Sequence, residues 1–195
     1  MGLWGATDAD ESKPKWMTTA QKKEVLATTA GWVVEAGSAM TGNDNTAATP
    51  EVLVATGGLT TSLGAATIDS VEWITTAADK SAGFTLSIRV RYNEAVDVAV
   101  SNPTIAVTNG NQGSGSGRGP HLLAYASGSS TSKLTFSLAI GAANAATNAD
   151  DVLVFGANPL ALNSGTIVDT AEGGNATITS AASIGTAAGS ITVTA

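Results

Sequence analysis

The 195-residue sequence contains no cysteine. This absence excludes disulfide bonds, cysteine-ligated zinc, iron–sulfur clusters and thiol nucleophiles, so the fold must be stabilised by packing and backbone pairing. Basic residues are also scarce, because nine Lys and Arg stand against sixteen Asp and Glu and the net charge is −7. A basic face that binds nucleic acid is therefore not expected.

Long hydrophobic runs and targeting signals are missing as well. The most apolar stretch, FSLAIGAANAA at 136–146, is too short and too small in its side chains to span a bilayer. The first sixteen residues carry acidic side chains with no basic region or apolar run before them, so they do not read as a secretory signal peptide. We expect a soluble protein that is made in the cytoplasm and has no membrane partner.

Groups suited to acid–base catalysis are few, since charged residues make up 13% of the chain and there is one histidine. That histidine, His121, ends the segment NGNQGSGSGRGPH at 109–121. A phosphate-binding loop needs a helix directly behind it, but the residues that follow have strand character. We therefore interpret the segment as a surface connection and His121 as a structural residue, and we expect no enzymatic activity and no cofactor.

Strict alternation of apolar and polar residues dominates from about residue 70 onward. In GFTLSIRVRY at 83–92 the apolar residues face one side and Arg89 and Arg91 the other, and SKLTFSLAI at 132–140 repeats the pattern. We expect Phe84, Leu86, Ile88 and Val90 to pack against Leu134, Phe136 and Leu138. Turn residues separate further short strands, expected at 70–76, 96–100, 104–108, 121–127, 151–156, 166–170, 176–181 and 190–195. The pattern predicts an all-β fold, a β-sandwich, over residues 70–195.

Residues 1–69 read differently. They contain one possible helix, with Thr18 and Gln21 at capping-box spacing, and one strand, EVLVAT at 51–56. Three of the four tryptophans, Trp4, Trp16 and Trp32, also lie here. Because bulky aromatics scattered among Gly, Thr and Asn do not suggest a core of their own, we expect an extended attachment segment that inserts them into pockets on a partner. Alternatively, the tryptophans cover the open end of the sandwich.

Calcium binding by the loops of the sandwich is an alternative that the sequence leaves open. Carboxylate oxygens are the ligands that calcium prefers, and four aspartates lie near predicted turns: Asp97, Asp150, Asp151 and Asp169. The simpler interpretation of Asp150 and Asp151 is that they are turn residues.

The alternating region resembles one bacterial Ig-like repeat of the kind found in tandem in large surface adhesins. The family pattern corresponds to five segments in the same order: 92–96, 103–110, 125–136, 150–153 and 163–175. Tyr92 and Asn93 depart from the residues usual there, and the glycine-rich insertion after Gly110 enlarges a loop. The resemblance implies an Ig-like sandwich.

The first part of the chain, from LWGATDADESKPKW to the GNDNT at 42–46, is similar to the N-terminal segments of virion structural proteins of tailed phages, particularly those that infect cyanobacteria. This resemblance implies a capsid decoration protein whose N-terminal segment binds the major capsid protein or another virion protein, with self-association in the particle as a further option. Alternatives are a tail, neck, baseplate or fibre component that binds a host-surface glycan, or an Ig-like module of a bacterial adhesin.

Overall fold

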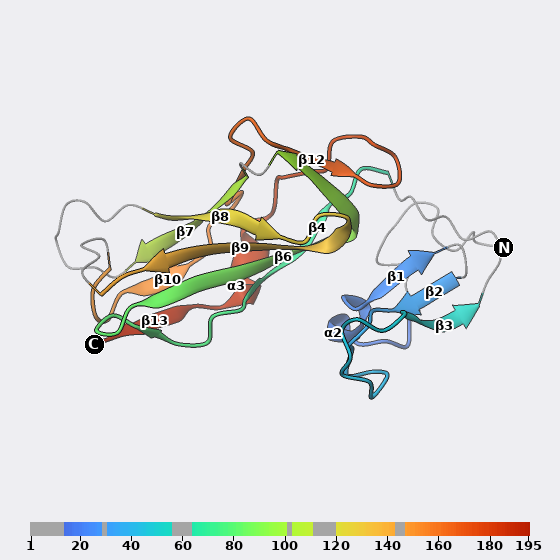
Figure 1. The fold of residues 1–195 in the computed structure, drawn as a ribbon, viewed down its shortest axis with the longest axis horizontal. Helices are drawn as coiled ribbons and strands as arrows, with labels where there is room; N and C mark the ends of the chain where they lie inside the picture. Colours follow the sequence, from blue (N-terminus) through green and yellow to red (C-terminus); the bar gives the residue numbers. More distant parts are fainter. Residues whose placement is uncertain (1–13, 29–30, 56–63, 101–102, 111–119, 143–146) are drawn as a thin grey trace.

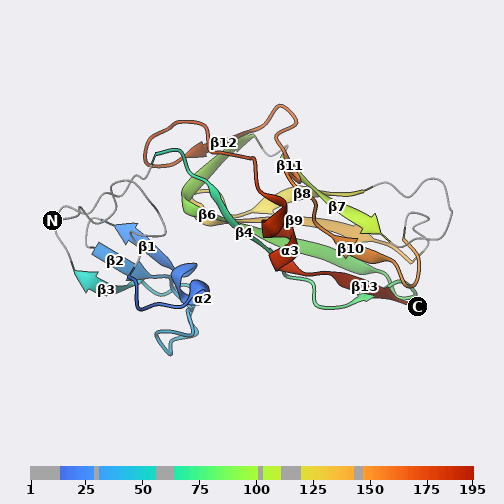
Figure 2. The same ribbon diagram turned by 180° about the vertical axis from the view of Figure 1, so that it is seen from behind.

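The computed structural model describes residues 14–28, 31–55, 64–100, 103–110, 120–142 and 147–195 (Figure 1). Within these residues the chain is mostly β-strand, so the prediction of an all-β protein is confirmed. The strands form a three-stranded small sheet and a ten-stranded, curled large sheet. The small sheet, near the N-terminus, and the large sheet lie at opposite ends of the molecule's long axis (Figures 1 and 2).

The N-terminal unit, residues 14–28 and 31–55, contains one short helix and the small sheet. Helix α2, Thr19–Lys22, begins with the predicted capping box: the Thr18 hydroxyl accepts from the Gln21 N–H, and Gln21 Oε1 accepts from the Thr18 N–H at 2.9 Å. The three antiparallel strands follow in spatial order as β1 (Val25–Thr28), β2 (Gly31–Val34) and β3 (Glu51–Ala55). The predicted strand at 51–56 is therefore present, whereas β1 and β2 were not predicted.

The large sheet has the spatial order β12-β6-β9-β8-β7-β10-β13-β5, with β4 paired to β6 and β11 to β7. All of its pairs are antiparallel except β13 with β5. The strands are β4 (Ile68–Trp73), β5 (Ala78–Asp79), β6 (Phe84–Val100), β7 (Thr104–Gly110), β8 (His121–Ser127), β9 (Thr131–Ile140), β10 (Val152–Val154), β11 (Leu160–Ala161), β12 (Thr166–Asp169) and β13 (Ile191–Thr194).

The predicted apolar faces of β6 and β9 share one core, and the two strands are hydrogen-bonded neighbours. Leu86 lies opposite Leu138, Ile88 opposite Phe136 and Val90 opposite Leu134. Of these, Leu86, Ile88, Val90, Leu134 and Phe136 are fully buried, and Leu138 packs at the margin of the same core. Alternation indicates which face of each strand is buried, because a slip of one residue would turn every apolar side chain to the other face.

Strand β6 is longer than the sequence suggested. The expected strands at 83–92 and 96–100 are one continuous element, and the ladder to β9 shifts register between Arg91 and Val96. The intervening residues stay paired to the chain ahead of β4, because Asn93 N donates to Thr67 O at 3.0 Å and Asn93 Oδ1 accepts from Thr67 N at 2.7 Å. A bulge therefore replaces the turn that the polar residues at 93–94 suggested.

The strand expected at 176–181 is absent, and a helix that was not predicted follows it. Residues 176–181 form no strand, and α3 spans Ala182–Ala188 and packs beside β4 (Figure 2). A Cβ added at Gly185 would lie 2.6 Å from the carbonyl oxygen of Phe155, so the helix approaches the chain after β10 more closely than any side chain would allow. Tertiary packing thus overrides the weak alternation of this segment.

Neighbouring leucines on β8 test which face of the large sheet is buried. Leu123 is fully buried, whereas Leu122 is 55% exposed. We expect Leu123→Ala to lower the free energy of unfolding by about 2–5 kcal/mol and Leu122→Ala to lower it by less than about 1 kcal/mol, measured by urea denaturation. Similar losses for both variants would mean that β8 does not present one face to the core.

Candidate functional site

The three tryptophans expected at a partner surface lie in different environments. Trp16 directly precedes α2 and is 67% exposed. Trp32, in β2, is 1% exposed, so its expected role as a partner contact is corrected: the side chain fills the interior of the N-terminal unit. Trp4 lies outside the described residues. Trp16 is thus the candidate anchor that the described part of the chain presents at the surface.

The N-terminal unit has a hydrophobic core of its own, contrary to the interpretation of this segment as unable to form one. Buried and partly buried side chains of two loops and three strands surround the Trp32 indole: Met17, Val25, Val34, Met40, Leu53 and Val54. Met17 and Met40 come from irregular segments, where no periodic pattern marks them as apolar contacts. Strands of four residues are also too short for alternation to reveal them.

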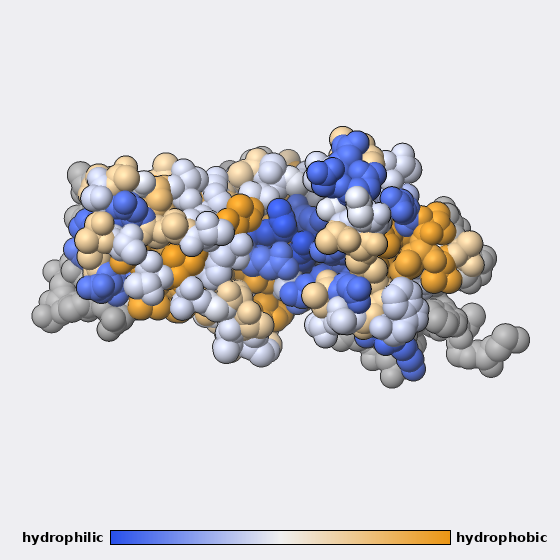
Figure 3. Space-filling model, turned by 90° about the horizontal axis from the view of Figure 1, so that it is seen from below, coloured by the Kyte–Doolittle hydropathy of each residue, from blue (hydrophilic) through white to orange (hydrophobic). Residues whose placement is uncertain are grey.

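An ionic junction joins the N-terminal unit to the large sheet. We define it by five side chains: Lys23, Glu35, Glu72, Arg91 and Lys133. Glu35, which directly follows β2, lies 3.5 Å from Arg91 Nη1 and also pairs with Lys133, and its Oε1 accepts from Ser132 Oγ at 3.1 Å. Strongly hydrophilic residues gather where the two bodies meet (Figure 3).

Arg91 is the most buried charge of the junction. The alternation of β6 places it on the outer face of the large sheet, but the N-terminal unit covers that face and leaves the residue 7% exposed. It lies directly opposite Lys133 on β9, and like charges in that position repel each other. Glu35 contacts both cations, and Glu72 Oε2 accepts from Arg91 Nε at 2.9 Å. Carboxylates of both bodies therefore compensate the cation pair.

The junction also controls the ionisation of Glu72. Burial alone would raise the pKa of this carboxyl, but the hydrogen bond and charge of Arg91, together with Lys23 and Arg89, outweigh burial and hold the pKa below its usual value of 4.5. Because the folded-state pKa is lowered, this interaction stabilises the protein above the usual pKa and is lost as the pH falls through the lowered value.

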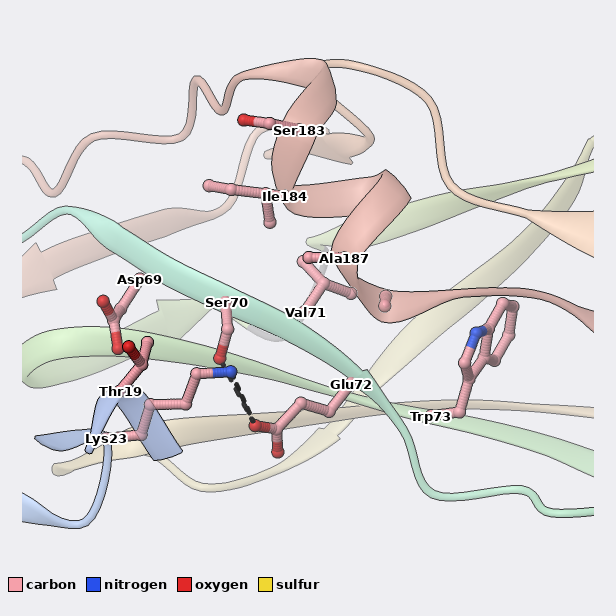
Figure 4. Close-up of a pocket in the computed structure, with 11 residues that line it drawn as sticks. Thr19, Lys23, Asp69, Ser70, Val71, Glu72, Trp73, Ser183, Ile184 and Ala187 are labelled. Atoms are coloured by element: carbon pink, nitrogen blue, oxygen red, sulfur yellow. Dashed lines mark hydrogen bonds and ion pairs between the residues drawn. The ribbon is translucent and has the colours of Figure 1, made fainter. Parts of the chain in front are cut away.

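A groove of about 530 Å³ runs along the same boundary (Figure 4). One end of its lining comes from Thr19 of α2 and from Lys23, the C-cap of that helix. Strand β4 supplies the residues from Asp69 to Trp73, and α3 supplies Ser183, Ile184, Ala187 and Ala188. Trp73 closes one end, where its ring stacks on Phe155 at a centroid distance of 4.2 Å and its indole N–H donates to Gly189 O at 3.3 Å. The groove therefore has a carboxylate-bearing wall and an aliphatic wall.

His121 is structural in this fold, as its isolation in the sequence indicated. It is 4% exposed, and its Nε2 lies 3.1 Å from the hydroxyl of Thr147, which is fully buried. Burial lowers the pKa of the imidazole, and the nearby charge of Asp151 opposes this only in part. The connection at 111–119 lies outside the described residues.

The four aspartates considered as calcium ligands take part in separate structural contacts or turns. Asp97 accepts from Ser130 Oγ at 2.6 Å, Asp150 adopts a positive φ of 65°, and Asp151 accepts from the Asn148 N–H at 2.7 Å. Asp169, fully buried, accepts three backbone N–H groups, those of Ala66, Ala171 and Glu172. Among the described residues, no group of three His, Asp or Glu side chains is placed to hold a metal ion.

Within the same part of the chain, the helices are too short and too polar to cross a membrane.

The buried histidine makes stability depend on pH. Because the folded-state pKa of His121 lies below its usual value of about 6.5, the unfolded chain binds the proton more readily, and stability falls as the pH drops below about 6.5. We expect His121→Gln to flatten the slope of unfolding free energy against pH between about 7 and 5. An unchanged slope in chemical denaturation across that range would contradict the assignment.

Asp169 holds the start of the large sheet to the turn after β12. We expect Asp169→Asn to cost about 1–3 kcal/mol, because one amide oxygen cannot accept all three N–H groups. Asp69→Asn, an exposed change in the groove, should alter stability by less than about 0.5 kcal/mol in the same thermal or urea unfolding experiment. Equal effects would mean that the backbone contacts of Asp169 contribute nothing.

No protein family, curated protein or solved structure was found to match this chain. Its function is therefore inferred from its own residues and contacts.

Proposed function

We propose that this chain is a non-enzymatic structural protein of a phage virion, a capsid decoration protein that binds the head surface through its N-terminal unit. The observation that carries the proposal is the division of the chain into two bodies with separate cores, of which the smaller exposes Trp16. Such a division allows the smaller body to attach to a particle while the larger body faces solvent, which is the arrangement that the tailed-phage resemblance of the N-terminal segment implies.

The exposed apolar groups of the N-terminal unit suit attachment to a protein lattice. Trp16 is 67% exposed, and Val52, on the edge strand β3, is 53% exposed. Tryptophan is among the residues that most often dominate the energy of a protein interface, because its large rigid surface is buried at little entropic cost. The major capsid protein, or another virion protein, is the partner that we propose for this surface.

The larger body suits display to solvent, and we propose that it is an Ig-like β-sandwich. The segments that resemble the adhesin repeat fall on strands and turns of the large sheet: 103–110 includes β7, 125–136 spans the connection from β8 to β9, and 163–175 includes β12. Turn residues in these segments have positive φ values, 64° at Ser130 and 47° at Asn163. Residues 64–195 carry five basic and nine acidic side chains, which favours solubility.

The absence of enzymatic activity is part of the proposal. The single histidine of the chain is 4% exposed and pairs with a buried threonine, so it is not accessible to a substrate. The groove between the bodies is the one observation that favours the alternative of a tail or fibre component that binds a host glycan. Labelling the protein in intact particles, on the head or on the tail, separates the two alternatives.

Trp16→Ser in the full-length chain tests the attachment surface. We expect at least about a 30-fold loss of apparent affinity for particles that lack the protein, measured by co-sedimentation, because loss of an aromatic anchor costs about 2 kcal/mol or more. Leu122→Ser, which removes an exposed apolar side chain from the large sheet, is the matched control and should bind as the wild type does. The reverse result would place the interface on the large sheet.

A further inference from the structure

We infer that the ionic junction is a releasable joint, so that the N-terminal unit docks on the large sheet reversibly and separates from it without unfolding. This inference concerns the chain itself and does not depend on the proposed role in a virion. In the described part of the chain, all buried hydrophobic residues except Val33 of β2 form two clusters, one in each body, and no residue belongs to both.

Several ion pairs and hydrogen bonds cross between the bodies. Glu35 reaches Arg91, Lys133 and Ser132 of the large sheet. In the other direction, Arg91 Nη1 donates to the carbonyl oxygen of Lys23 at 3.4 Å. The Lys23 ammonium lies 3.7 Å from Glu72 Oε1. A small number of ion pairs and hydrogen bonds around the Arg91 guanidinium therefore connect the two bodies.

In such a joint, the cost of removing the charges from water and the attraction between them are similar in size. The side chains of Arg91 and Glu35 are 9% and 11% exposed, so docking removes both charges from most of their water, and their mutual attraction offsets that cost. Undocking returns both charges to water and leaves each hydrophobic core intact. The covalent connection between β3 and β4 keeps the two bodies at a high effective concentration, which favours the docked state even when the contacts are weak.

Loss of the negative charges of Glu35 and Glu72 leaves the cations of the boundary without compensation. Glu35 faces Arg91 on β6 and Lys133 on β9, and Glu72 faces Lys23, Arg89 and Arg91. On its own unit, Glu35 neighbours Glu24, whose carboxylate is engaged by Ser38 Oγ. Without the two carboxylate charges, four cations would remain at one boundary: Lys23, Arg89, Arg91 and Lys133. Their mutual repulsion favours separation, so the joint weakens as the pH falls through the lowered pKa of Glu72.

The lack of cysteine allows a direct measurement of docking. Ala47 in the N-terminal unit and Ala139 on β9 are exposed, and cysteines introduced at these two positions would be the only thiols to carry spin labels. By double electron–electron resonance, we expect a single narrow distance distribution at pH 7.5. We expect at least a tenfold rise in the separated population for Glu35→Gln at the same pH, and for the unsubstituted junction as the pH falls through the lowered pKa of Glu72.

Three controls keep the result decisive. Glu51→Gln removes an exposed carboxylate of β3, outside the junction, and should leave the narrow distribution unchanged. Lys133→Gln removes one cation that Glu35 contacts, so it should broaden the distribution and provides a second test if Glu35→Gln does not fold. In a chain whose other three tryptophans are replaced by Phe, the fluorescence of the buried Trp32 should stay at its native wavelength when the bodies separate. Narrow distributions for both junction variants, or separation accompanied by exposure of Trp32, would overturn the inference.

Discussion

The arrangement of the two bodies depends on one buried charge, the guanidinium of Arg91. It lies in the middle of the longest strand, opposite another cation, on a face that the N-terminal unit covers. A buried charge is tolerated where its hydrogen-bonding groups find partners, and those of Arg91 reach the carboxylates of Glu35 and Glu72 and the carbonyl of Lys23. Electrostatic compensation at Arg91 therefore helps to determine where the smaller body docks.

Carboxylates have a second role in the large sheet, where they replace backbone partners at irregular places. Asp169 gathers three N–H groups from the start of the sheet and the turn after β12, and Asp151 accepts from Asn109 and Asn148 where β7 meets the chain ahead of β10. These positions join segments far apart in the sequence. The N–H of the buried Ala66, ahead of β4, would otherwise lack the Asp169 acceptor.

The sequence predicted those features that depend on local periodicity. Alternation from Phe84 to Tyr92 and from Leu134 to Ile140 was enough to predict which residues of β6 and β9 share one core, and Thr18 and Gln21 predicted the capping box. It did not predict features that depend on distant contacts. Trp32 packs with Met40, Glu35 covers Arg91, and α3 packs beside β4, and local periodicity indicates none of these contacts. Of the candidate site, the sequence singled out Trp16, whose role at a partner stays a prediction, and it did not predict the ionic junction.

The position of the junction on β6 determines how the molecule would bear mechanical load. A pull on the N-terminal unit reaches the large sheet at Arg91, and on either side of it β6 is held by ladders to β4 and β9. A few ion pairs yield at lower force than two ladders of hydrogen bonds loaded together. We expect the joint to separate before the ladders of β6 break, so that the large sheet keeps its fold under tension.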